Sequence, residues 1–83
     1  MGRRITHKSL DETQTQIKAL LNHPVRISYN NRGREVSDVG TITAVFGSLF
    51  IFEYQRKGQN FKSSFTYSDV MTEEIYVDEY DNH

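Results

Sequence analysis

The chain of 83 residues is long enough for one small domain, which buries only roughly 60% of its unfolded surface. It has no cysteine, which excludes disulfides, thiolate nucleophiles and cysteine-based zinc sites, and no apolar run approaches the ~20 residues of a membrane span. The net charge is −1 and no apolar segment follows Arg3 and Arg4 as in a signal peptide, so we expect a cytoplasmic protein without cofactor or membrane contact.

The first predicted element is a helix over residues 10–22, preceded by a flexible N-terminus of residues 1–8. Ser9 and Glu12 have the spacing of a capping box, in which the hydroxyl accepts from the amide of residue 12 and the glutamate bonds back to residue 9. Asn22 and the restriction that Pro24 places on the residue before it end the helix. The helix carries one apolar stripe that must pack against the rest of the domain. The stripe consists of Leu10, Ile17, Leu20 and Leu21.

From Pro24 onward apolar and polar residues alternate, which predicts β-strands. The expected strands are 25–30, 35–46, 49–54 and 61–67. A turn at 30–33 is expected because Asn and Gly tolerate the positive φ of a tight hairpin, and 56–60 forms another turn. Gly40 inside the second strand predicts a bulge or a sharp bend, as small barrels need.

The alternation breaks at residues 68–72 and resumes at Ile75. A single 3₁₀ turn capped by Ser68 or Asp69 explains the break, and it lets residues 72–77 close a barrel against an earlier strand. The predicted fold is mainly β, a five-stranded SH3-like or Sm-like barrel preceded by one N-terminal α-helix. A single domain of residues 9–77 holds both parts.

Two stretches of the sequence, HPVRISYNNRGREVSDVGTITAVFGSLFIFEYQ and FKSSFTYSDVMTEEIYV, resemble the Veg family of small proteins from Gram-positive bacteria. The closing motif runs from Ser64 to Glu73 and has Met71 in place of leucine. Further matches are Gly40, Ser48 and Phe50. The departures are Phe46-Gly47 in place of Tyr-Pro and His23-Pro24 in place of Gly-Lys.

This resemblance covers residues 10–77 and implies an Sm-like barrel with a role in regulating gene expression. It implies that the protein stimulates biofilm formation by binding a protein partner, such as a DNA-binding repressor of matrix genes. The first functional hypothesis is therefore a small, non-enzymatic regulatory protein.

The basic hairpins support a second hypothesis, a nucleic-acid-binding Sm-like barrel. Arginines at exposed turns bind phosphate or carboxylate in bidentate geometry. The candidate residues for partner or nucleic-acid binding are Arg26, Arg32, Arg34, Arg56 and Lys57. Three interpretations stay open: plain solvation, an acidic protein surface, or a nucleic-acid backbone if all five line one face. Sm proteins that form RNA-binding rings have an Arg-Gly step near the last strands, whereas residues 67–70 here are acidic, so that function is not indicated.

Catalysis and metal binding are not predicted. The sequence has no nucleophile elbow, no phosphate-binding glycine loop and no His-x-x-x-His pair, and its three histidines are far apart. The carboxylates are concentrated near the C-terminus, where no apolar pocket is visible that would raise a pKa for acid–base chemistry. We therefore expect no enzyme and no metal site.

Several aromatic and turn residues have structural interpretations. Tyr67, Ser68 and Asp69 form the predicted structural turn, with a buried tyrosine and a capping aspartate. A core role is favoured over a base-stacking platform for Tyr29, Phe46, Phe50, Phe52, Phe61 and Phe65.

The segment SLFIFEY, residues 48–54, predicts self-association because it is apolar on both sides. If one side fills the barrel, the other needs a cover, and a large exposed aromatic patch is unusual on a monomer. We expect a two-fold homodimer that covers Phe50, Phe52 and Tyr54, with docking of the helix as the alternative cover.

The end of the chain is acidic. Residues 1–68 hold all ten Lys and Arg against five acids, whereas residues 69–83 hold six acids and no base. Residues 78–83 are therefore expected to form an acidic tail, either a solvated end or a counterpart to a basic binding body.

Overall fold

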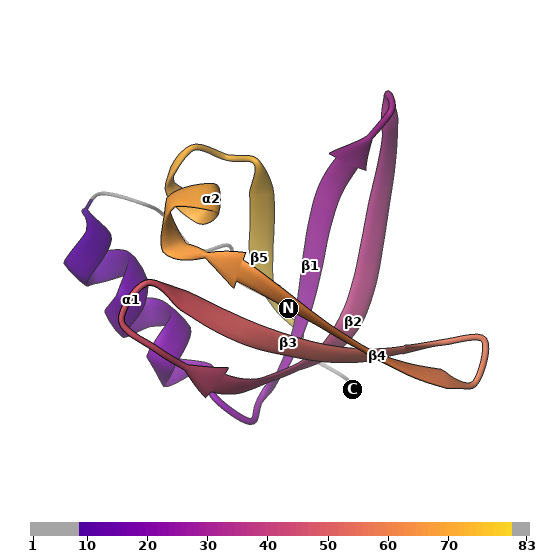
Figure 1. Cartoon of the computed structure of the whole chain (residues 1–83), viewed down its shortest axis with the longest axis horizontal. Helices are drawn as coiled ribbons and strands as arrows, with labels where there is room; N and C mark the ends of the chain where they lie inside the picture. Colours follow the sequence, from indigo (N-terminus) through magenta and orange to yellow (C-terminus); the bar gives the residue numbers. More distant parts are fainter. Residues whose placement is uncertain (1–8, 81–83) are drawn as a thin grey trace.

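The computed structural model describes residues 9–80, and the predicted flexible N-terminus and the last three residues of the predicted tail lie outside this range. Its elements are α1 (Leu10–Ala19), β1 (Pro24–Asn31), β2 (Arg34–Val45), β3 (Leu49–Arg56), β4 (Gln59–Thr66), α2 (Tyr67–Met71) and β5 (Ile75–Glu79). The five strands form one antiparallel sheet in the order β4-β3-β2-β1-β5. The prediction of a mainly β fold with one N-terminal helix is confirmed (Figure 1).

Helix α1 begins where the sequence predicts and ends three residues earlier. The amide of Glu12 donates to Ser9 Oγ at 3.1 Å, which caps the first turn. After the C-cap Leu20, Asn22 takes a left-handed φ of 65° and its amide donates to the carbonyl of Ile42 at 2.8 Å, so the chain turns onto the sheet. Leu10 is wrongly assigned to the buried stripe, because it is 50% exposed, one turn before the first buried position of the helix.

Both hairpins close with two-residue turns in which a basic residue precedes glycine. Arg32 and Gly33 join β1 to β2, and Lys57 and Gly58 join β3 to β4. All four residues have φ between 54° and 80°, as a type I′ turn requires. The first turn is therefore shorter than predicted, and its left-handed positions fall on Arg32 and Gly33 rather than on asparagine.

Strand β2 exchanges partners near its middle. It pairs with β1 from Arg34 to Thr41 and with β3 from Gly40 to Val45, so β2 has both neighbours only at Gly40 and Thr41, and the β1–β2 and β3–β4 hairpins diverge from there (Figure 1). Of the two alternatives predicted at Gly40, a bulge or a sharp bend, the bulge lies elsewhere, since the register shifts between Ile42 and Ala44. Gly40 lets β2 approach β3 closely, since a Cβ there would collide with the carbonyl oxygen of Glu53 and lie 2.8 Å from Tyr54 Cβ.

The segment between β4 and β5 corrects two predictions. The expected 3₁₀ turn is a five-residue α-helix, α2, and its N-cap is Thr66 rather than Ser68 or Asp69. Strand β5 does pair with an earlier strand, β1, but no pairing joins it to β4 within residues 9–80. The predicted barrel is therefore not closed: β4 and β5 are the two edges of the sheet, and α2 connects them along the chain.

The core lies between the sheet and the two helices. Its buried hydrophobic residues are Ile17, Leu20, Val25, Ile27, Ile42, Phe50, Phe52, Tyr67, Val70, Ile75 and Val77. The assignment of Phe50 and Phe52 to an exposed self-association surface is wrong, because these side chains are at most 1% exposed. They share the core-facing side of the sheet with Ile42, which is opposite Phe52. Tyr54 continues this side and is half-buried.

The boundary of the acidic tail also moves. Strand β5 runs through Glu79, and Asp78 lies opposite Arg26 of β1. The amide of Tyr80 donates to the carbonyl of Pro24 at 3.1 Å. The first two residues of the predicted tail are therefore part of the sheet, where an acidic side chain faces a basic one across the strands.

Candidate functional site

The five basic candidates do not form one row. Arg32 and Arg34 lie at the tip of the β1–β2 hairpin, and Arg56 and Lys57 lie at the tip of the β3–β4 hairpin. The two tips point in different directions (Figure 1). Arg26 lies at neither tip but near the start of β1. All five side chains are exposed. Within residues 9–80, these five candidates therefore do not assemble a single cationic face for a nucleic-acid backbone.

Arg56 is engaged within the molecule. Its Nη2 and Nε donate to the two carboxylate oxygens of Asp38 at 2.6 and 3.2 Å, and its guanidinium lies 5.7 Å from the ring centroid of Tyr54. The bidentate hydrogen bond to Asp38 raises the pKa of Arg56. Asp38 lies on β2 just beyond the point where β2 leaves β3, so the ion pair connects the two hairpins across their divergence. Arg56 therefore has a structural role, in which its side chain links the β1–β2 hairpin to the β3–β4 hairpin.

Arg26 also has neighbours in the body of the domain. Its guanidinium lies 5.6 Å from the ring centroid of Tyr80, and Asp78 is its cross-strand neighbour. By contrast, the side chains of Arg32, Arg34 and Lys57 make no hydrogen bond or ion pair with any residue of the described range. These three cations are the ones best placed to meet a partner.

A chain of aromatic contacts crosses the core-facing side of the sheet toward the β3–β4 tip. The ring centroids are 6.5 Å apart for Tyr29 and Phe65, 6.4 Å for Phe65 and Phe52, 5.2 Å for Phe52 and Tyr54, and 5.6 Å for Tyr54 and Phe61. Phe61 ends the chain and is 39% exposed. The core assignment of Phe61 is therefore wrong, as is that of Phe46, which is 54% exposed in the β2–β3 loop. Phe61 lies on an edge strand, and the sequence analysis missed this position as a sign that its ring is exposed.

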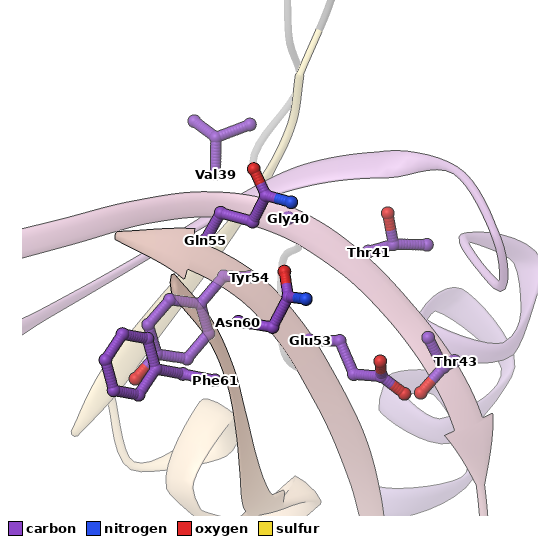
Figure 2. A pocket seen from close by; sticks show the side chains of 9 residues that line it. All are labelled: Val39, Gly40, Thr41, Thr43, Glu53, Tyr54, Gln55, Asn60 and Phe61. Carbon is purple, nitrogen blue, oxygen red and sulfur yellow. The ribbon is translucent and has the colours of Figure 1, made fainter. Parts of the chain in front are cut away.

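A hollow lies over the bend at Gly40, where β2, β3 and β4 twist together (Figure 2). Its lining is Val39, Gly40, Thr41, Thr43, Glu53, Tyr54, Gln55, Asn60 and Phe61. Figure 2 shows the rings of Tyr54 and Phe61 stacked together. Glu53, the carboxylate of this lining, lies 3.8 Å from Lys62 Nζ. The amides of Gln55 and Asn60 point to one side of the strands and the stacked rings to the other (Figure 2), so the lining offers hydrogen-bonding groups and an aromatic pair on different sides, a set that indicates no acid–base chemistry.

The predicted structural turn is built around α2. Tyr67 is fully buried and its hydroxyl donates to the carbonyl oxygen of Phe46 at 2.6 Å, while burial raises its pKa. Asp69 completes a capping box: its amide donates to Thr66 Oγ1 at 3.0 Å and its carboxylate accepts from the Thr66 amide at 3.1 Å. The carbonyl of Ser68 accepts from the Thr72 amide at 2.9 Å. These residues hold the turn together.

Within residues 9–80, no group of three or more His, Asp or Glu side chains could hold a metal ion. No helix in the same range is both long and apolar enough to cross a membrane.

Comparison with known proteins identifies the family. A search of curated proteins gave no match. The family model described as biofilm formation stimulator VEG matches residues 8–78, which include every helix and nearly every strand residue of the fold. This chain belongs to the VEG family of biofilm formation stimulators.

Proposed function

We propose that this protein is a non-enzymatic cytoplasmic regulator that changes gene expression by binding a protein partner, such as a DNA-binding repressor. Membership of a family of biofilm formation stimulators supports the biological role. The partner surface is acidic, because the groups of this chain best placed to meet it are cations without partners in the described structure. The protein thus acts by occupying a surface of its partner.

The observation that carries this proposal is the tip of the β1–β2 hairpin. Arg32 and Arg34 lie on either side of Gly33: Arg32 is in the tight two-residue turn and Arg34 is the first residue of β2. The backbone that presents them is therefore well defined. The hairpin projects beyond the body of the domain (Figure 1). Two forked guanidinium groups on such a tip match carboxylates on a partner, and their contact raises affinity and directs encounter.

A pull-down with nuclease treatment tests the proposal. We expect the wild-type protein to retain a protein partner after nuclease digestion, and the double variant Arg32→Glu/Arg34→Glu to lose it while its unfolding transition stays unchanged. The control, Lys18→Glu, reverses an exposed cation on α1, away from both hairpin tips, and should retain the partner. Equal retention by the double variant and the control would show that the β1–β2 tip is not the contact.

Nucleic-acid binding is a second candidate because of the stacked pair Tyr54 and Phe61. Phe61 is 39% exposed, and the Arg56 guanidinium lies 5.7 Å from the ring centroid of Tyr54, an arrangement that resembles the stacking platforms on which single strands bind. In this case binding weakens steeply with salt, since each neutralised phosphate releases counterions. A gel shift at about 50 mM salt with DNA and RNA single strands decides between the candidates, because a protein-binding regulator shows no shift there.

A further inference from the structure

The outer side of β4 is a long open edge of the sheet. Strand β4 covers eight residues, Gln59–Thr66, and β3 is its one strand neighbour within the described range. Proteins protect such edges with proline, charge, bulges or a covering segment. Strand β4 has no proline, one charged side chain, Lys62, and no shift in its register with β3. The edge is therefore a ready template for another strand.

The β3–β4 turn fixes which backbone groups of β4 face this open edge. A two-residue turn makes its flanking residues, Arg56 and Gln59, a hydrogen-bonded pair, and such pairs then recur at every second position. The amides and carbonyls of Asn60, Lys62 and Ser64 consequently point away from β3. The amide of Thr66 agrees with this alternation, because it donates to the Asp69 carboxylate instead of to β3.

We propose that the open edge of β4 binds the same edge of a second copy of this chain, in an antiparallel register centred on Ser63. In this register the outward groups of Lys62 bond those of Ser64 of the second copy, at two positions related by the two-fold axis, whereas the Thr66 amide stays bonded to Asp69. The two five-stranded sheets become one continuous sheet around a two-fold axis. This inference stands apart from the proposed partner binding, which uses the other hairpin.

The side chains of β4 favour a second copy as the occupant. In this register Phe61 lies opposite Phe65 of the second copy, which covers a ring that is 39% exposed in one copy. Aromatic cross-strand pairs stabilise antiparallel sheets. Small Ser63 side chains meet at the axis, and Lys62 faces serine rather than lysine. The charge of Lys62 also has its own partner, Glu53, at 3.8 Å.

The mass of the protein in solution is the first test. Sedimentation equilibrium of the full chain should give a species of about twice the 9.7 kDa of one chain at about 100 µM, well above common specific dissociation constants. A species of one chain mass at that concentration overturns the proposal.

Cysteine cross-linking tests the register, and the chain offers a clean background because it has no cysteine. Ser63→Cys places two thiols directly opposite each other, within the Cα separation that a disulfide needs, so mild oxidation should give a covalent dimer. Ser64→Cys is the matched control: its thiol faces residue 62 of the second copy, and the two Cys side chains are offset beyond disulfide reach. Cross-linking of the residue 64 variant in preference to the residue 63 variant overturns the register.

A charge change at Ser64 gives a test with a sign. Ser64 is exposed and faces away from the core, so neither Ser64→Lys nor Ser64→Glu should disturb the fold. Lysine opposite Lys62 of the second copy should weaken the dimer about fivefold, and glutamate should strengthen it by a similar factor, because each change acts at two symmetry-related pairs. Equal dissociation constants for the two variants overturn pairing through β4.

Discussion

The smallest feature with a measurable consequence is the side chain of Asp69. The Asp69 carboxylate accepts a hydrogen bond from the Thr66 amide, and the backbone amide of Asp69 donates to Thr66 Oγ1. Together these bonds cap a helix of only five residues. We predict that Asp69→Ala lowers the free energy of unfolding by about 1 kcal/mol, the usual cost of a lost capping side chain. Denaturant unfolding of the purified variant measures this change.

The adjacent residue provides the control. The Ser68 hydroxyl takes no part in the capping box, and Ser68 contributes to the turn through its carbonyl. Ser68→Ala should therefore leave the unfolding midpoint within error of the wild type. An unchanged midpoint for Asp69→Ala would show that the capping box contributes nothing to stability.

At the scale of elements, alternation and turn chemistry predicted the strands well. The Ser9 cap and the glycine-containing hairpin turns follow from local sequence. Local sequence does not show which side of β3 faces the core, because residues 49–52 are apolar on both sides and a period of two then fits either orientation. The register with β2 decides it by placing Phe52 opposite the buried Ile42.

The candidate site was predictable only in part, for a related reason. Sequence indicated which cations sit at turns, but the pairing of Arg56 with Asp38 depends on where β2 leaves β3. Likewise, the open sheet depends on the path of α2, which local patterns do not specify. Contacts between distant segments decided what the pattern left undetermined.

The divergence of the two hairpins gives a prediction for β2. A methyl group at Gly40 would collide with backbone of β3, at the Glu53 carbonyl oxygen, and with Tyr54 Cβ at 2.8 Å. Neither of these groups can move without shifting the strand. We predict that Gly40→Ala lowers the free energy of unfolding by about 3 kcal/mol, the upper part of the range for overpacking. Thermal and denaturant unfolding measure the loss.

Gly47 is the matched control for this substitution. A Cβ at Gly47 meets no atom within 4 Å, and the residue does not have a positive φ. Gly47→Ala should change the stability by less than about 0.5 kcal/mol, as for ordinary surface positions. Similar losses for both variants would mean that close approach at the bend is not what requires glycine.

At the scale of the whole molecule, three elements meet at one carbonyl oxygen. The Phe46 carbonyl in the β2–β3 loop accepts from the Tyr67 hydroxyl of α2 at 2.6 Å and from Gln14 Nε2 of α1 at 3.3 Å. Both helices are thereby tied to the end of the sheet that lies away from the hairpin tips (Figure 1). Because Tyr67 is fully buried, its ionisation concerns the stability of the entire fold.

The pH dependence of stability follows from the raised pKa of Tyr67, which burial shifts above the ordinary value of about 10. Below pH 10 the phenol is neutral in both states, and its contribution to stability is complete. Above that pH the unfolded chain ionises first, so the free energy of unfolding falls as pH rises toward the folded-state pKa.

Tyr67→Phe should cost about 1 kcal/mol at neutral pH through the lost hydrogen bond, and its deficit relative to the wild type should shrink above about pH 10. Gln14 also lowers the pKa of Tyr67 and is therefore no independent control, whereas Gly40→Ala changes no group near this hydroxyl, so its deficit should stay constant across the same range. Denaturant unfolding from pH 7 to 11 measures both, and a constant deficit for Tyr67→Phe would mean that this tyrosine does not couple ionisation to folding.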